Sequence, residues 1–319
     1  MEELASVNRR KFLQQAGTLL VGTGVAAAIP IDAFADSQKF TKLTILHTND
    51  VHSRIEPYPM DGGRNQGKGG AARRATLIAK IRKEEKHVLL FDAGDTVQGT
   101  PYFNMFGAEL EMDLMNKMGY DASTFGNHEF DNGLEKLAKM VSRAEFPFII
   151  SNYDFTGTPM EGHYKPYQVF TKGGIKVGVF GLGIELNGLV DPLLSKGVVY
   201  NYPIAVANEM VNRLKNDLKC DLVVCLSHLG YNYRPEENKV SDKVLAAQTS
   251  GIDLIIGGHT HTFLPEPEHV KNLSGGLTTI NQVGTGGIYL GRLDFIFEKK
   301  TGNKRLLAYN YTVDESVVA

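Results

Sequence analysis

Apolar and polar positions along the chain follow two alternating patterns. Short runs rich in apolar and β-branched residues predict buried strands at 42–48, 87–92, 121–125, 146–150, 221–226 and 253–256. Between them, helical spacing of apolar residues predicts helices at 71–86, 100–119, 132–144, 204–218 and 241–249. Strands that alternate with helices are typical of an α/β fold.

The middle and the end of the chain depart from this alternation. Residues 167–171 and 175–180 predict two strands, and Gly173-Gly174 between them predicts a hairpin. Residues 277–313 predict three further strands, with a turn at 301–303. Because the sequence contains no internal repeat and no interdomain linker, we expect one domain over residues 36–319.

The composition and net charge indicate which classes of protein can be excluded. The chain has 319 residues, of which 42% are hydrophobic, so it can bury a sizeable core. Its formal net charge is -2, and no long run of like charges occurs. A nucleic-acid binder would show a basic surface, so we exclude extended nucleic acid as a partner.

Residues 1–35 predict an export signal. Arg9-Arg10 precede Phe12-Leu13 and an apolar stretch rich in Gly and Ala, and 33–35 form a small-x-small cleavage sequence. The arrangement resembles a twin-arginine signal, with an ordinary secretory signal or an uncleaved anchor as the alternative. We therefore expect a periplasmic or secreted protein with no stable membrane span after cleavage.

The two cysteines are predicted to be free. Cys220 and Cys225 lie on either side of the apolar run 221–224 of a predicted strand, and residues an odd number of positions apart in a strand face opposite sides. A disulfide between them is therefore not expected, although exported proteins often contain one.

Residue types that bind metals follow the predicted strands at five places. These candidates are Asp50, His52, Asp95, Asn127, His228, His259 and His261. In open α/β sheets, functional residues lie at the ends of strands. Oxygen and nitrogen ligands without thiolate suit Mn, Zn, Fe or Co, and so many ligands suit two ions better than one.

Other polar residues near these motifs are expected to have structural roles. His47 faces the opposite side of its strand and is expected in the core. Asp92 is expected to hold its loop by hydrogen bonds, which leaves Asp95 to reach over the strand ends. Arg73 and Arg74 fall on the predicted outer face of a helix and are expected to be solvated.

The motifs, taken together, resemble those of the calcineurin-like metallophosphoesterases. Asp-x-His, Gly-Asp, Gly-Asn-His-Glu, Ser-His and Gly-His-x-His occur in order. Longer stretches, at 46–50, 69–74, 99–103 and 126–133, are similar to the metal-binding domain of secreted bacterial 5'-nucleotidases. The resemblance covers nearly all of residues 42–313. It implies a four-layer αββα sandwich of two mixed β-sheets flanked by helices, with a dinuclear metal site at the carboxyl ends of the strands.

The resemblance also implies a role for each candidate. One divalent metal would be bound by Asp50, His52, Asp95 and His261, and the other by Asp95, Asn127, His228 and His259, with Asp95 bridging. Many nucleotidases have Gln or Asn where this chain has His261. His128 and Asp131 would form a catalytic dyad, although Asp131 could instead cap the following helix. The implied reaction is in-line attack of a metal-activated water on a phosphate ester.

The substrate is less defined than the reaction. In the family a separate C-terminal domain supplies nucleoside recognition, and this sequence shows no match to it. We expect nucleoside 5'-monophosphates or related nucleotides as substrates, and a separately encoded C-terminal specificity domain as partner. The alternatives are a broad phosphomonoesterase or cyclic phosphodiesterase, a sulfur-ester hydrolase, and a non-catalytic metal-dependent binding subunit. The presence of both His128 and Asp131 favours an enzyme.

Overall fold

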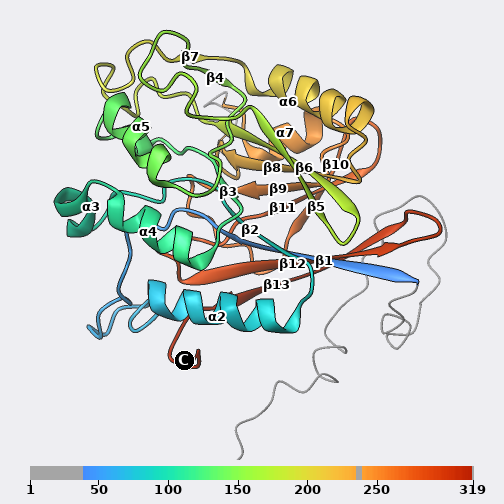
Figure 1. Ribbon diagram of the computed structural model, residues 1–319, viewed down its shortest axis with the longest axis horizontal. Helices are drawn as coiled ribbons and strands as arrows, with labels where there is room; N and C mark the ends of the chain where they lie inside the picture. The colour runs from blue at the N-terminus through green and yellow to red at the C-terminus, as the bar shows by residue number, and fades with distance from the viewer. Residues whose placement is uncertain (1–38, 235–238, 318–319) are drawn as a thin grey trace, which may run out of the picture.

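The computed structural model describes residues 39–234 and 239–317 (Figure 1). The predicted export signal at residues 1–35 lies outside these ranges. Within them, no helix combines the length and the apolar character needed to cross a membrane.

A five-stranded mixed sheet forms one half of the sandwich. Its strands, in spatial order, are β13 (Lys304–Thr312), β12 (Tyr289–Glu298), β1 (Phe40–Thr48), β2 (Val88–Asp92) and β3 (Ala122–Ser123). The strands β1, β2 and β3 are parallel, whereas β12 is antiparallel to both of its neighbours. The carboxyl ends of the three parallel strands therefore share one edge of the sheet.

A six-stranded mixed sheet forms the other half. Its order is β10 (Glu268–Lys271), β11 (Leu277–Asn281), β9 (Leu254–Gly257), β8 (Leu222–His228), β6 (Ile175–Gly183) and β5 (Tyr167–Lys172). The four inner strands are parallel, and the edge strands β5 and β10 are antiparallel to their neighbours. β5 and β6 form the predicted hairpin. A separate two-stranded sheet pairs β4 (Tyr153–Asp154) with β7 (Val199–Tyr200).

Helices cover the outer face of each sheet, which gives four layers (Figure 1). On the five-stranded sheet lie α2 (Ala71–Glu84), α4 (Glu109–Met118) and α5 (Leu134–Arg143). On the six-stranded sheet lie α6 (Pro203–Val211), its π-helical continuation η3 (Asn212–Asp217), and α7 (Asp242–Gln248). Buried side chains such as Ile45, Phe91, Val177 and Val224 fill the space between the sheets. The predicted sandwich is confirmed.

Three predicted elements differ from the structure. The helix predicted at 100–119 is divided into α3 (Pro101–Phe106) and α4, because Gly107 and Ala108 adopt left-handed backbone at φ 57° and 80°. The strand β3 has only two residues, and the run 146–150 contributes only isolated bridges at Phe148 and Ile149. The apolar runs correctly indicated burial, but burial alone does not provide a partner for a ladder of hydrogen bonds.

Two predictions about single side chains have opposite outcomes. Cys220 and Cys225 are free and buried, as predicted. Arg74, predicted to be solvated, is only 3% exposed, because it lies on the same face of α2 as the buried Leu77 and Ile78. Arg73 is half-buried and donates a hydrogen bond to the carbonyl of Gly67.

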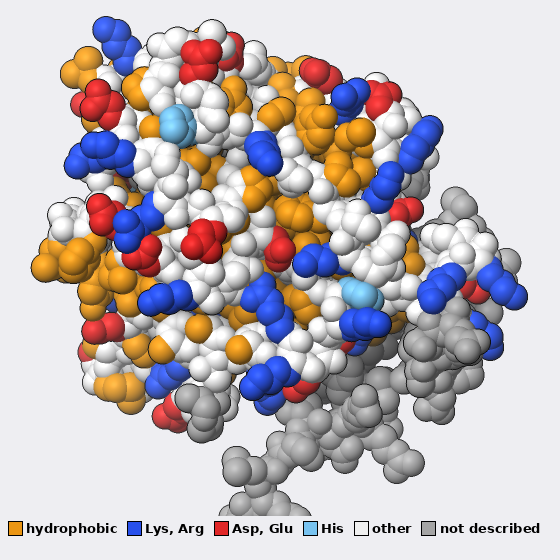
Figure 2. All heavy atoms as spheres, in the orientation of Figure 1, with side chains coloured by type: hydrophobic (Ala, Val, Ile, Leu, Met, Phe, Trp, Pro, Cys, Tyr) orange, Lys and Arg blue, Asp and Glu red, His pale blue; other side chains and the backbone are white. Residues whose placement is uncertain are grey.

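One face of the molecule carries acidic and basic side chains close to one another. On the face shown in Figure 2, acidic and basic side chains are interspersed, with apolar side chains between them. This face therefore has no extended basic area that would attract a nucleic-acid backbone.

Candidate metal centre

The loops at one edge of both sheets carry the predicted site residues. Asp50 and His52 follow β1, Asp95 follows β2, Asn127 and the 3-10 turn η2 (His128–Phe130) follow β3, His228 ends β8, and His259 and His261 follow β9. All five strands are parallel members of their sheets. Residues that are far apart in sequence are therefore delivered to one place by the strand order.

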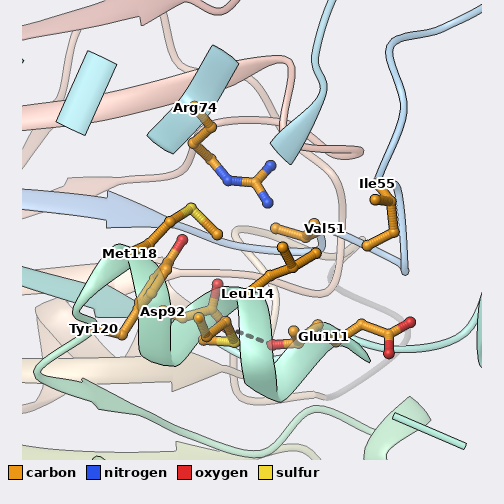
Figure 3. A pocket seen from close by; sticks show the side chains of 10 residues that line it. Val51, Ile55, Arg74, Asp92, Glu111, Leu114, Met118 and Tyr120 are labelled. Atoms are coloured by element: carbon orange, nitrogen blue, oxygen red, sulfur yellow. Dashed lines mark hydrogen bonds between the residues drawn. The ribbon is translucent and has the colours of Figure 1, made fainter. Parts of the chain in front are cut away.

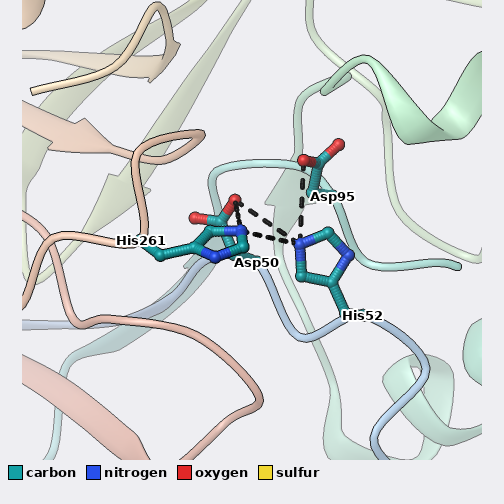
Figure 4. Close-up of side chains that lie close together, drawn as sticks. All are labelled: Asp50, His52, Asp95 and His261. Atoms are coloured by element: carbon teal, nitrogen blue, oxygen red, sulfur yellow. Dashed lines mark hydrogen bonds and ion pairs between the residues drawn. The ribbon is translucent and has the colours of Figure 1, made fainter. Parts of the chain in front are cut away.

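Asp50, His52, Asp95 and His261 form a first group of candidate ligands (Figure 4). One ligand atom from each lies within 4.8 Å of the others. The Nε2 atoms of His52 and His261 are 2.9 Å apart, and His261 Nε2 lies 3.5 Å from Asp50 Oδ1. Two imidazole nitrogens that converge on carboxylate oxygens form a donor set suited to a divalent cation.

Asp95, His228 and His259 form a second group, again with ligand atoms within 4.8 Å of one another. Asn127 adjoins it, with its Oδ1 2.9 Å from Nδ1 of His259. His228 Nε2 lies 3.0 Å from Asp95 Oδ2, yet this buried nitrogen has no hydrogen-bond partner among the described residues. This nitrogen faces the Asp95 carboxylate without a well-formed hydrogen bond, and a metal ion held by both groups fits this position. Asp95 belongs to both groups.

The protonation of the histidines suits metal binding. Burial lowers the pKa of His259 and of His261 to about 4, and it also lowers the pKa of His52. These imidazoles are therefore neutral near pH 7, as metal ligands must be. Burial alone would also lower the pKa of His228, but the adjacent carboxylate of Asp95 raises it to about 10. A divalent cation would take the place of that proton.

The candidate ligands occupy an unusual backbone conformation. Five of them have positive φ angles, namely Asp50 at 49°, His52 at 52°, Asp95 at 52°, His259 at 73° and His261 at 52°. The left-handed region costs an L-residue roughly 1–2 kcal/mol. Such conformations persist where the surrounding structure enforces them, and they cluster at functional sites.

Asp92 supports the loop that carries Asp95, as the sequence analysis predicted. Its Oδ1 accepts hydrogen bonds from Gly94 N at 2.9 Å, Thr96 Oγ1 at 3.0 Å and Ser123 Oγ at 3.2 Å. Its Oδ2 accepts one from Thr48 Oγ1 at 2.6 Å. With both oxygens engaged, Asp92 serves to hold the loop.

Asp50 is held from several directions. Its backbone N–H donates to Gly94 O at 2.9 Å, and its carboxylate accepts from His259 N at 3.0 Å. Asn49 Nδ2 donates to Asp50 Oδ2 at 2.6 Å. Asn49 was not among the predicted site residues, although its place directly before a candidate ligand was a usable signal. By contrast, His47 lies buried in the core, as expected, with its Nε2 2.8 Å from Asn281 Nδ2.

His128 and Asp131 form a hydrogen-bonded pair beside the two groups. Nδ1 of His128 lies 2.7 Å from Asp131 Oδ2, and this hydrogen bond raises the pKa of His128. The His128 ring lies 5.3 Å from the ring of His52, centroid to centroid. The helix-cap interpretation of Asp131 is wrong, because α5 begins after Gly133 and has no side-chain cap. The pair is partly exposed, and so it can reach a molecule at the site.

The fold and this convergence of carboxylates, an amide and imidazoles define an α/β sandwich with a candidate metal-binding centre. Residues 43–263 match the sequence model of the calcineurin-like phosphoesterase family. The chain therefore belongs to the calcineurin-like phosphoesterases, a family of metal-dependent hydrolases that act on phosphoester bonds.

Several relatives of this chain are named 5'-nucleotidases. A snake venom 5'-nucleotidase from Gloydius brevicauda is 36% identical over 87% of this chain and 50% of its own length. A 5'-nucleotidase from Vibrio cholerae is 35% identical over 86% of this chain and 52% of its own length. The crystal structure of a 5'-nucleotidase precursor from Thermus thermophilus is 31% identical with a TM-score of 0.77, over 87% of this chain and 56% of that one. The chain thus spans about half the length of these relatives.

Proposed function

We propose that this protein hydrolyses nucleoside 5'-monophosphates or related nucleotides with two divalent cations bound at the site. The observation that carries the proposal is the pair of ligand groups that share Asp95. The substrate class is supported by the relatives, which are named 5'-nucleotidases. Because the chain spans about half of their length, the reaction is better supported than the substrate.

The proposed ligands divide into two sets. Asp50, His52, Asp95 and His261 would hold one cation, and Asp95, Asn127, His228 and His259 would hold the other. The oxygen and nitrogen donors suit Mn, Zn, Fe or Co. When bound, two such cations supply Lewis acidity toward a phosphoryl group and acidify water.

His128 and Asp131 would assist the departure of the alcohol. Asp131 accepts the hydrogen bond from Nδ1 of His128, which fixes the ring and leaves Nε2 to act on the substrate. From that position His128 can protonate the leaving oxygen or stabilise developing negative charge. This pair favours an enzyme over a metal-dependent binding subunit, because a subunit that only binds has no need of an oriented acid.

The substrate would enter from the side where the site is exposed. The side chains of His261 and His128 are 43% and 34% exposed, whereas those of Asp50 and His228 are fully buried. The buried residues therefore form the floor of the site. A phosphate ester would approach over His128 and His261, with its leaving group directed outward.

We also propose that residues 1–35 direct twin-arginine export to the periplasm or the exterior, and that residues 36–319 form the phosphoesterase domain. A venom enzyme among the relatives supports an exported protein. A separately encoded chain, equivalent to the remaining half of the relatives, would supply recognition of the base.

A substrate panel tests the proposal. The purified protein with added Mn²⁺ should hydrolyse AMP, p-nitrophenyl phosphate and glycerol phosphate, and EDTA should abolish the activity. Similar kcat/KM values for the three substrates would support a separate specificity partner. A kcat/KM far higher for AMP would show that base recognition is built into this chain. No hydrolysis of any of them would overturn the proposed function.

A further inference from the structure

We propose that Glu129 is a positioning residue that sets the carboxylate shared by the two candidate metal sites, Asp95. This inference rests on the proposed function. Glu129 lies in the same motif as Asn127 and His128, but it belongs to neither group of candidate ligands. Its side chain is only 3% exposed.

Both carboxylate oxygens of Glu129 accept hydrogen bonds from backbone N–H groups. Oε2 accepts from Asp95 N at 3.0 Å and from Gly126 N at 2.6 Å. Oε1 accepts from Thr96 N at 2.8 Å. One buried side chain therefore ties the loop after β2 to the loop after β3.

These bonds act on a residue whose backbone is in the left-handed region. Asp95 has φ 52°, and Glu129 binds the N–H groups of Asp95 and of the next residue, Thr96. In return, Oδ1 of Asp95 accepts a hydrogen bond from His128 N at 2.9 Å. The two loops are thus linked in both directions, and Oδ2 of Asp95 is left to face His228 and His52.

Gly126 makes this close approach feasible. A Cβ atom added at Gly126 would overlap the carboxylate of Asp95, so the two loops meet only because this position has no side chain. Glu129 then holds the N–H of Gly126 at 2.6 Å. Asp95 is therefore fixed by contacts with its neighbours before any cation arrives. Such preorganisation strengthens metal binding, because the ligand need not be ordered when the metal binds.

A glutamine cannot reproduce the arrangement. Gln has one acceptor oxygen and one donor nitrogen, whereas all three partners of Glu129 are N–H donors. In Glu129→Gln at least one N–H group would face the amide nitrogen. The substitution keeps the size of the side chain, so it tests the loss of one of the two acceptor oxygens.

The chain offers a matched control. Glu111 on α4 is also 3% exposed, and neither of its carboxylate oxygens has a hydrogen-bond partner among the described residues. Glu111→Gln therefore changes a buried carboxylate that makes no hydrogen bond to the loops of the site. Any general effect of losing a buried charge should appear in both variants.

Mn²⁺ titration of the full chain by calorimetry tests the inference. We expect Glu129→Gln to weaken Mn²⁺ binding by about 10- to 100-fold, the usual effect of losing a residue that orients a ligand. Glu111→Gln should bind Mn²⁺ like the wild type. A merely structural role for Glu129 would lower the melting temperature of the metal-free protein and leave Mn²⁺ affinity unchanged, which would overturn the inference.

Two further results distinguish a failure of the proposed function from a failure of the role proposed for Glu129. If the wild-type chain does not bind Mn²⁺, the proposed function fails rather than the role of Glu129. If Glu129→Gln does not fold, Glu129→Asp provides the test, because it keeps the charge on a side chain too short to reach all three N–H groups. Wild-type Mn²⁺ affinity in a folded Glu129→Asp variant would contradict the inference.

Discussion

The candidate metal centre and a small cavity beside it both bury polar atoms that lack a hydrogen-bond partner among the described residues. In the metal centre the unpartnered atom is Nε2 of His228, which lies 3.0 Å from Asp95 Oδ2 and 3.9 Å from Asp50 Oδ1. In the cavity the unpartnered atoms belong to Arg74 and Glu111, which have opposite charges.

The cavity is much too small for a substrate. Its volume is about 10 Å³, and its walls include Val51, Asp92 and Tyr120 (Figure 3). Arg74 extends into it from α2, and Glu111 lies on α4 at another part of its wall. This volume matches about one water molecule, which would form hydrogen bonds to polar atoms of the wall.

The comparison shows that unpartnered buried atoms do not by themselves identify a ligand site. In the candidate metal centre, ligand atoms of carboxylates and imidazoles converge within 4.8 Å of one another, an arrangement that suits a cation. In the cavity, a cationic and an anionic side chain line a space that a neutral water molecule fits. The identity of the converging groups therefore decides which ligand fits.

The largest effect should come from removing the shared carboxylate. Asp95→Ala should reduce phosphatase activity to background, because both ligand groups lose a member. Mn²⁺ content by elemental analysis should fall well below the wild-type value, whereas Glu111→Gln should keep that value. A variant that retains its full metal content would show that Asp95 is not the bridge.

The next effect should come from His128, which lies beside the ligands without belonging to either group. His128→Ala should lower turnover by about 10²- to 10⁴-fold, the usual contribution of a positioned acid or base. Its Mn²⁺ content should remain that of the wild type. Loss of metal from this variant would make His128 a ligand and would refute the dyad with Asp131.

The smallest effect should come from the cavity, and it should concern stability. Glu111→Leu removes one of the two carboxylates that line the cavity with Arg74, which should lower the free energy of unfolding by roughly 1–3 kcal/mol. Urea unfolding measures this loss, and Arg74→Met combined with Glu111→Leu should recover part of it. Turnover of the folded, Mn²⁺-loaded variant should match the wild type. A large loss of turnover would mean that the cavity and the site are coupled.

The candidate ligands and the core between the sheets could be predicted from the sequence. The ligand motifs were recognisable because each follows an apolar run, and parallel strands bring their carboxyl ends to one edge. Asp95 could be separated from Asp92 because only Asp95 lies beyond the glycine of its turn. The apolar core between the two sheets could likewise be predicted from apolar runs such as those of β2 and β8.

The burial of Arg74 could not be predicted from helical spacing. Its guanidinium lies against Gly287, in a loop that also donates a hydrogen bond from Gly286 N to Asp50 O at 2.8 Å. That loop precedes β12 and meets α2 only in the folded chain. The role of Glu129 depends in the same way on contacts with Asp95 and Thr96, a loop distant in sequence. Local patterns predict elements, whereas these contacts arise only from tertiary packing.

Anomalous diffraction from crystals grown with Mn²⁺ tests the central claim most directly. We predict two Mn²⁺ positions about 3.5–4 Å apart, the usual separation in two-metal sites. One should lie among Asp50, His52 and His261, the other near His228 and His259, and Asp95 should contact both. A single position, or one away from Asp95 such as beside Glu111, would contradict the account.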